Sequence, residues 1–163
     1  KLNNKQFGIP PYKGGTREKS KLNVIEIEMN KGMHENKILN LLSLSTEDRY
    51  TYFIRHCADF EQVWGLVVGE DNWVIFKDNE GDKIFPLWPH IELAELYCFE
   101  EHKKLGAKPQ AINLEAFIQK CIPDMISGSV YFGAFYDGNR QGLVVTGDKL
   151  RWDLIEEINL VWE

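Results

Sequence analysis

The sequence has no apolar run long enough to cross a membrane. Its longest apolar stretches, such as 64–68 and 143–145, have the length of a β-strand. No segment near the N-terminus shows the basic, apolar and small-residue order of a secretory signal. These absences predict a cytoplasmic protein without a membrane partner.

Cysteine is scarce: Cys57, Cys98 and Cys121 are odd in number and far apart in the chain. This pattern fits neither a disulfide framework nor a zinc site, and it indicates a reducing compartment. A thiol near a histidine can be an activated nucleophile, and His56 precedes Cys57. Because free cysteine is among the most frequently buried residue types, we expect three structural thiols instead.

Standard enzyme signatures are missing. The chain has no phosphate-binding glycine loop, no H-E-x-x-H, no Cys-x-x-Cys and no nucleophile elbow. Asp78, Glu80 and Asp82 alternate as at the start of a calcium loop, but glycine stands at the fourth position and Pro89 at the twelfth. We therefore expect an ordinary polar turn there, with no metal and no cofactor, and we favour a protein that is not an enzyme.

Charge is distributed unevenly along the chain. Residues 1–28 carry six basic and three acidic side chains, a net charge of +3. Since the whole chain has a net charge of −6, residues 29–163 carry −9. An acidic body disfavours nucleic acid as a partner. It suits a basic protein partner, or it serves only to keep the domain soluble.

The first 28 residues read as an irregular basic arm. They contain Pro10-Pro11 and Gly14-Gly15 and no sustained apolar period. Met29 and Met33 could each be a translation start, in which case the arm is an upstream or vector-derived extension. We therefore divide the chain into the arm, residues 1–28, and a single domain, residues 29–163.

Hydrophobic periodicity within residues 29–163 alternates between helical and strand patterns. A capping box begins the clearest helix, with Ser45 three residues before Asp48. The expected helices cover 35–44, 45–57, 90–102, 113–122 and 148–161, and the expected strands cover 63–68, 73–76, 83–88, 129–136 and 143–146. No βαβ alternation dominates. The pattern predicts an α+β fold with a mainly antiparallel sheet of about five strands, a three-strand meander plus a C-terminal hairpin, covered by helices.

The third of these strands runs into a corner at Trp88-Pro89-His90. Pro86 and Pro89 each lack an N–H, so the strand must stop near Trp88 and a helix can begin near Pro89. In the first helical turn, the positive end of the helix dipole favours a neutral His90 imidazole that can bind a ligand; the alternative is a purely structural hydrogen bond. Trp88 is expected in the core, or else as an exposed stacking platform.

Several sequence motifs match one known family. They are Arg49-Tyr50-x-Tyr52-Phe53-Ile54, Phe60-Glu61-x-Val63-Trp64-Gly65-Leu66, Pro86-Leu87-Trp88-Pro89-His90, Pro109-x-Ala111-Ile112-x-Leu114-x-x-Phe117 and Ile122-Pro123. With these motifs, the chain from about Ser45 to Ile158 resembles the bacterial family named domain of unknown function 2750. Phe60 and Cys121-Ile122 depart from the tryptophan and the tryptophan-leucine pair expected at these positions. The resemblance implies domain boundaries and no activity. The layout of the chain is also loosely similar to small bacterial immunity domains.

Two functions are consistent with these patterns. The first is a non-catalytic, acidic protein-binding domain, of immunity or adaptor type, whose partner is a basic protein. The alternative is a small-molecule-binding domain or minor enzyme with a pocket at the Trp88-Pro89-His90 corner. The candidate binding residues are Trp88, His90, Tyr50, Trp64 and Arg49.

Overall fold

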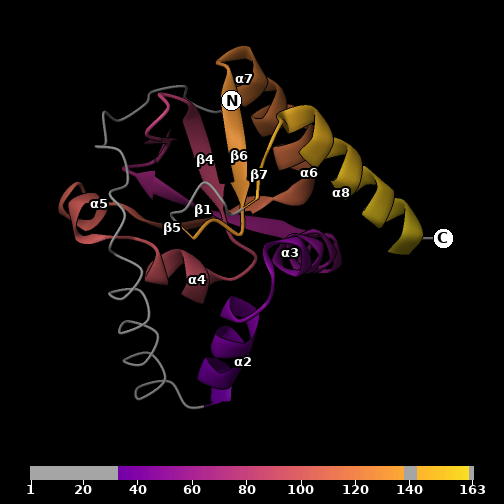
Figure 1. Ribbon diagram of the computed structural model, residues 1–163. Helices are drawn as coiled ribbons and strands as arrows, with labels where there is room; N and C mark the ends of the chain where they lie inside the picture. Colours follow the sequence, from indigo (N-terminus) through magenta and orange to yellow (C-terminus); the bar gives the residue numbers. More distant parts are fainter. Residues whose placement is uncertain (1–32, 138–142, 162–163) are drawn as a thin grey trace.

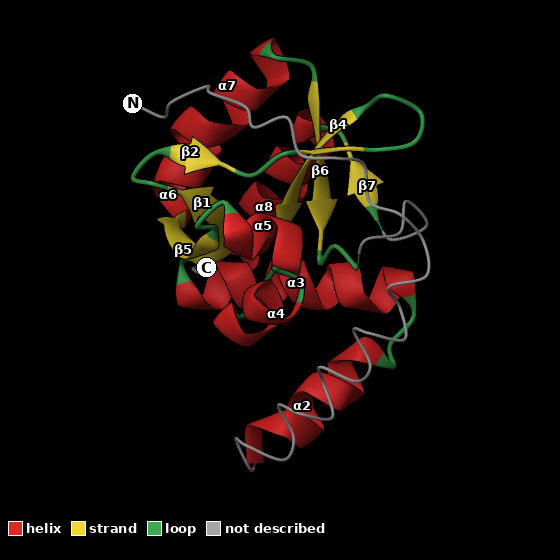
Figure 2. Cartoon of the chain, turned by 90° about the vertical axis from the view of Figure 1, so that its left-hand side faces the viewer, coloured by secondary structure: helices red, strands yellow, loops and turns green. Residues whose placement is uncertain are grey.

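The computed structural model describes residues 33–137 and 143–161. The expected arm at 1–28 and most of the turn that follows Tyr136 lie outside the described residues. The division into an arm and a domain therefore stays a prediction. Along the described chain the elements begin with two helices, α2 (Met33–Leu42) and α3 (Thr46–Phe60). Figure 2 shows α2 projecting beyond α3.

The strands form two sheets (Figure 2). The first sheet has the order β2-β1-β5 and is antiparallel throughout; its strands are β1 (Gln62–Val68), β2 (Asn72–Trp73) and β5 (Lys108–Asn113). The second has the order β3-β4-β6-β7, with strands β3 (Phe76–Lys77), β4 (Lys83–Leu87), β6 (Val130–Ala134) and β7 (Val144–Val145). In the second sheet only β4 and β6 are parallel. The α+β class with mainly antiparallel pairing is therefore confirmed.

The expected meander is present as two hairpins in different sheets. The main chain leaves the first sheet after Trp73 and enters the second at Phe76, so the stretch predicted as one strand contributes to both. A main-chain bridge reconnects the sheets at the corner, where Trp64 and Trp88 exchange N–H···O bonds of 2.9 and 2.8 Å. The N–H and carbonyl groups of Trp64 and Trp88 thus keep hydrogen-bond partners although the strand direction changes.

The remaining helices cover the two sheets. They are α4 (Ile91–Leu96), α5 (Glu100–Lys104), α6 (Leu114–Ala116), the π-helical turn η1 (Phe117–Cys121), α7 (Ile122–Ser127) and α8 (Gly147–Val161). In Figure 1, α6, α7 and α8 lie on one side of β4 and β6, whereas α4 and α5 lie on the other. The apolar side chains between these layers form one continuous buried cluster, consistent with a single domain.

Two helix boundaries differ from the prediction. The helix expected over 90–102 is two short helices, because α4 ends at Leu96 and the chain is extended at Phe99 before α5. Pro123 does not end the next helix. The Ile122 N–H bonds to the Phe117 carbonyl, the wider spacing of a π turn, and Pro123 then lies in the first turn of α7. This wider turn allows a residue that lacks an N–H to follow without breaking the helix.

The helix α3 begins as predicted, since the Ser45 side chain caps it by accepting a hydrogen bond of 3.1 Å from the Asp48 N–H. Its apolar stripe is buried. The expected burial of the three thiols is confirmed, because Cys57, Cys98 and Cys121 are all free and buried. Burial raises the pKa of each of these thiols.

Candidate functional site

The corner brings together four rings from α3 and the start of α4. Tyr52, His56 and Phe60 follow one another at four-residue spacing on α3, so their side chains share one flank of that helix. His90 is the residue before α4, with an extended backbone and no side-chain cap bond to the helix. We call Tyr52, His56, Phe60 and His90 the ring cluster.

The Tyr52 hydroxyl lies between the two imidazoles. Its Oη is 2.6 Å from His90 Nε2 and 3.4 Å from His56 Nδ1. A neutral phenol has a single O–H hydrogen, so it can donate to only one of these nitrogens. The other nitrogen must carry a hydrogen and donate to Oη. The three groups therefore form a directed hydrogen-bond chain that is complete while both imidazoles are neutral.

The rings also pack against one another, His56 stacking on Phe60 and lying tilted against His90. The ring centroids of His56 and His90 are 4.0 Å apart, and those of His56 and Phe60 are 4.4 Å apart. His56 and His90 are half-buried, whereas Phe60 is 63% exposed. The cluster therefore runs from a partly buried tyrosine to a phenylalanine at the surface.

The electrostatic environment keeps His56 neutral. Burial, with smaller contributions from His90 and Lys37, lowers its pKa to about 4 against the opposing effect of Asp59 and Glu92. Burial likewise raises the pKa of Tyr52 above its ordinary value. At pH 7 this side of the corner presents neutral, polarisable rings with carboxylates nearby.

Trp88 is a core residue. Its side chain is fully buried, its indole N–H donates to the Tyr136 carbonyl over 2.8 Å, and it stacks on Tyr97 with centroids 6.2 Å apart. Trp64, which bonds to Trp88 through the main chain, is half-buried. Of the two positions predicted for Trp88, the structure shows the buried one. The indole packs in the core beneath the corner.

Arg49 is buried, although its position in the sequence lies off the main apolar stripe of α3. Its guanidinium pairs with Asp137 at 3.2 Å, the two side chains being 10% and 12% exposed, and lies over the Phe135 ring at 5.6 Å. Among the described residues, no partner bonds to Arg49 Nε. This pair fastens α3 to the chain that leaves β6.

Tyr50 fastens α3 to α8. Its hydroxyl donates to Asp153 at 2.5 Å, and Lys149 also bonds to Asp153, at 2.8 Å. Burial and this hydrogen bond raise the pKa of Tyr50. The five predicted binding residues thus occupy different surroundings: His90 joins the ring cluster, Trp88 and Trp64 form the bridge, and Arg49 and Tyr50 contact acidic partners.

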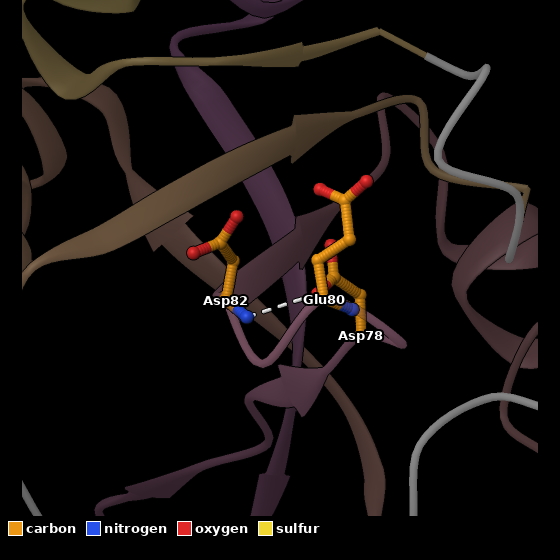
Figure 3. Close-up of side chains that lie close together, drawn as sticks. All are labelled: Asp78, Glu80 and Asp82. Carbon is orange, nitrogen blue, oxygen red and sulfur yellow. Dashed lines mark hydrogen bonds between the residues drawn. The ribbon is translucent and has the colours of Figure 1, made fainter.

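The acidic turn between β3 and β4 brings three carboxylates together (Figure 3). One oxygen from each of Asp78, Glu80 and Asp82 lies within 4.8 Å of the others. Asp78 Oδ1 accepts hydrogen bonds from the Glu80 N–H, at 3.0 Å, and the Asp82 N–H, at 2.9 Å. This side-chain-to-backbone bonding is a common way to stabilise a tight turn.

Sequence reasoning singled out His90 but not Tyr52 or His56 as its partners. The spacing of Tyr52 and His56 on one helix was a usable signal, because residues four apart on a helix are neighbours. Nothing local in the sequence connects them to His90, which follows 38 residues after Tyr52.

A family model described as "Protein of unknown function (DUF2750)" matches residues 50–154. No curated protein and no solved structure matches the chain. Among the described residues, no helix has the length and apolar character needed to cross a membrane.

Proposed function

The chain belongs to the DUF2750 family of proteins of unknown function, and from this premise we propose that it is a non-catalytic protein-binding domain for a basic protein partner. A role of the immunity or adaptor type is part of this proposal. The observation that carries it is an acidic surface with exposed large apolar side chains. Residues 29–163 have a net charge of −9, from a total of −6 and +3 on the first 28 residues.

The three most exposed large apolar side chains lie on two adjacent helices. Phe60 on α3 is 63% exposed, and Trp152 and Leu160 on α8 are 65% and 71% exposed. Arg55 on α3 reaches Glu157 on α8 at 3.9 Å, so the two helices run beside each other. Exposed tryptophan and phenylalanine are typical anchors of protein–protein interfaces, since they bury a large area at little cost in side-chain entropy.

The reactive groups also favour binding over catalysis. Burial raises the pKa of Cys57 and Cys121, which disfavours the thiolate form that a nucleophile needs. The Tyr52 phenol has a raised pKa and is held in a hydrogen bond to His90. These groups are therefore suited to structural roles at pH 7.

The test is affinity capture of the full chain from a native lysate, washed at low and at moderate salt and analysed by mass spectrometry. We expect one basic protein in stoichiometric amount, partly lost at moderate salt because surface charges are screened. The purified partner should then bind in a 1:1 ratio by calorimetry. The double variant Trp152→Ala, Leu160→Ala should weaken binding if α8 contributes, and recovery of no specific protein at either salt concentration refutes the proposal.

One observation favours a second candidate, a small-molecule-binding domain or minor enzyme at the corner. The Tyr52 hydroxyl between two imidazole nitrogens is a polar group that a ligand could replace or extend. Because Trp88 is fully buried, such a ligand would contact the ring cluster instead. A metabolite screen by thermal melting should give a shift that His90→Ala abolishes and Trp152→Ala preserves; a shift equal in all three proteins rules this site out.

A further inference from the structure

The surface end of the ring cluster combines an exposed ring with acidic groups. Phe60 is exposed while one side of its ring stacks on His56. Asp59, exposed on the preceding position of α3, and Glu92, half-buried on α4, both act electrostatically on His56. Carboxylates from two helices thus act on the same imidazole that packs beneath the exposed ring.

This combination is complementary to a guanidinium group. Arginine stacks its flat, weakly hydrated cation on aromatic faces, and its N–H groups bind carboxylates in a fixed fork. Lysine carries a compact, strongly hydrated charge and gains less from a ring. The neutral state of His56 at pH 7 removes a positive charge that would repel such a cation.

We propose that the ring cluster, with Asp59 and Glu92 beside it, is the docking surface for an arginine side chain of the basic protein partner. The inference rests on the proposed function and adds the place and the chemistry of the contact. The cation stacks on Phe60 and is oriented by the two carboxylates. Tyr52 and His90 act as positioning residues, because their 2.6 Å hydrogen bond holds α3 and the start of α4 together beneath the exposed ring.

One neighbouring positive charge opposes this docking. Its removal therefore tests whether arginine binding becomes stronger, as the proposal requires. Lys37 on α2 is exposed, and its charge lowers the pKa of His56. The same charge must repel a docked guanidinium. Its removal should therefore strengthen arginine binding, whereas removal of a lysine that plays only a structural role would leave binding unchanged or weaken it.

The experiment uses the full chain and two blocked probes, a hexa-arginine peptide and a hexa-lysine peptide, at moderate salt. Dissociation constants are measured by calorimetry, and the ring signals of His56, Phe60 and His90 are followed by NMR. We expect Phe60→Ala to weaken hexa-arginine binding about 5-fold or more and hexa-lysine binding less, since cation–π stacking favours arginine. Tyr131→Ala is the control, because it removes an exposed aromatic ring on β6, outside the proposed surfaces, and should leave both constants unchanged.

Lys37→Gln should tighten hexa-arginine binding about 2-fold or more, as expected for a partly screened surface charge. The inference is overturned if Phe60→Ala and Tyr131→Ala bind hexa-arginine equally, or if the three ring signals do not move on addition of the peptide. If the native partner is captured by wild-type protein and by Phe60→Ala with the same affinity, the docking surface lies elsewhere and the proposed function still holds. If wild-type protein captures no basic partner while its ring cluster binds hexa-arginine, the proposed function fails and the arginine site remains.

Discussion

Replacement of Trp88 by phenylalanine tests whether the corner is held from the core. Trp88 is fully buried, and its indole N–H donates a 2.8 Å hydrogen bond to the Tyr136 carbonyl. Trp88→Phe removes this donor and the outer part of the indole, because the phenyl ring is attached directly to Cβ and takes the place of the inner, five-membered ring. The smaller ring keeps only part of the stacking contact with Tyr97.

The expected loss of stability can be estimated from these contacts. The lost hydrogen bond costs about 1 kcal/mol net. The missing part of the indole is equivalent to about two buried methylene groups, at roughly 0.8 kcal/mol each, and some of the space left behind will not be refilled. The free energy of unfolding should therefore fall by about 2–3 kcal/mol, which corresponds to a melting temperature lower by roughly 4–12 °C for a chain of this size.

The assay is urea unfolding followed by far-UV circular dichroism, which does not depend on tryptophan fluorescence. Trp152→Phe is the matched control, because Trp152 is 65% exposed and its replacement should change the free energy of unfolding by less than about 0.5 kcal/mol. Equal urea midpoints for the two variants would refute the assignment of Trp88 to the core and would reopen its role as a ligand platform.

Three other predictions concern His56, the Arg49–Asp137 pair and the packing around Gly133. The pKa of His56 is about 4 in the folded protein, whereas in the unfolded chain it has its ordinary value near 6.5. Between these values the unfolded state binds more protons, so stability should fall as the pH falls from about 6.5 towards 4. NMR titration should give the low pKa directly, and His56→Gln should unfold with a weaker pH dependence over this window; equal dependence in both proteins would contradict the assignment. Asp137→Ala leaves the buried Arg49 guanidinium without its ion-pair partner and should cost about 3 kcal/mol or more in urea unfolding. A loss below about 1 kcal/mol would mean that solvent already solvates this pair. A Cβ on Gly133 would lie 2.5 Å from a Tyr136 ring carbon, so Gly133→Ala should destabilise by about 1–3 kcal/mol. Gly128→Ala, whose nearest contact would be 3.6 Å, should be nearly neutral, and similar melting temperatures for the two alanine variants would contradict the packing argument.

The best-predicted features depend on neighbours in the sequence. The Ser45 cap lies three residues from its partner Asp48, and the apolar residues of α3 recur at helical spacing. Both features are present in the structure. The C-terminal hairpin is also present, with Phe132 opposite Val145. Such features are readable because their hydrogen bonds and their apolar faces are set within one or two turns of the chain.

The poorly predicted features depend on packing. The parallel pairing of β4 with β6 places Lys83 opposite Val130 after a long crossover connection. No local sequence pattern predicts this pairing. The helix expected from 90 to 102 breaks after Leu96, because the short chain segment between α4 and α5 must place Tyr97 and Cys98 in the core. Helical propensity alone could not reveal this demand.

The features of the candidate site also separate into those that the sequence predicts and those that only the packing reveals. The amino-acid sequence by itself determined the acidic balance of residues 29–163, the α+β class and the family, and it singled out His90 at a proline corner as a candidate. Only the tertiary structure decided that Trp88 supports this corner from the core and that His90 meets Tyr52 and His56. The physical reason is that composition, spacing and turn chemistry are properties of the chain. The burial of a ring and the meeting of two imidazoles depend instead on how sheets and helices from distant segments pack.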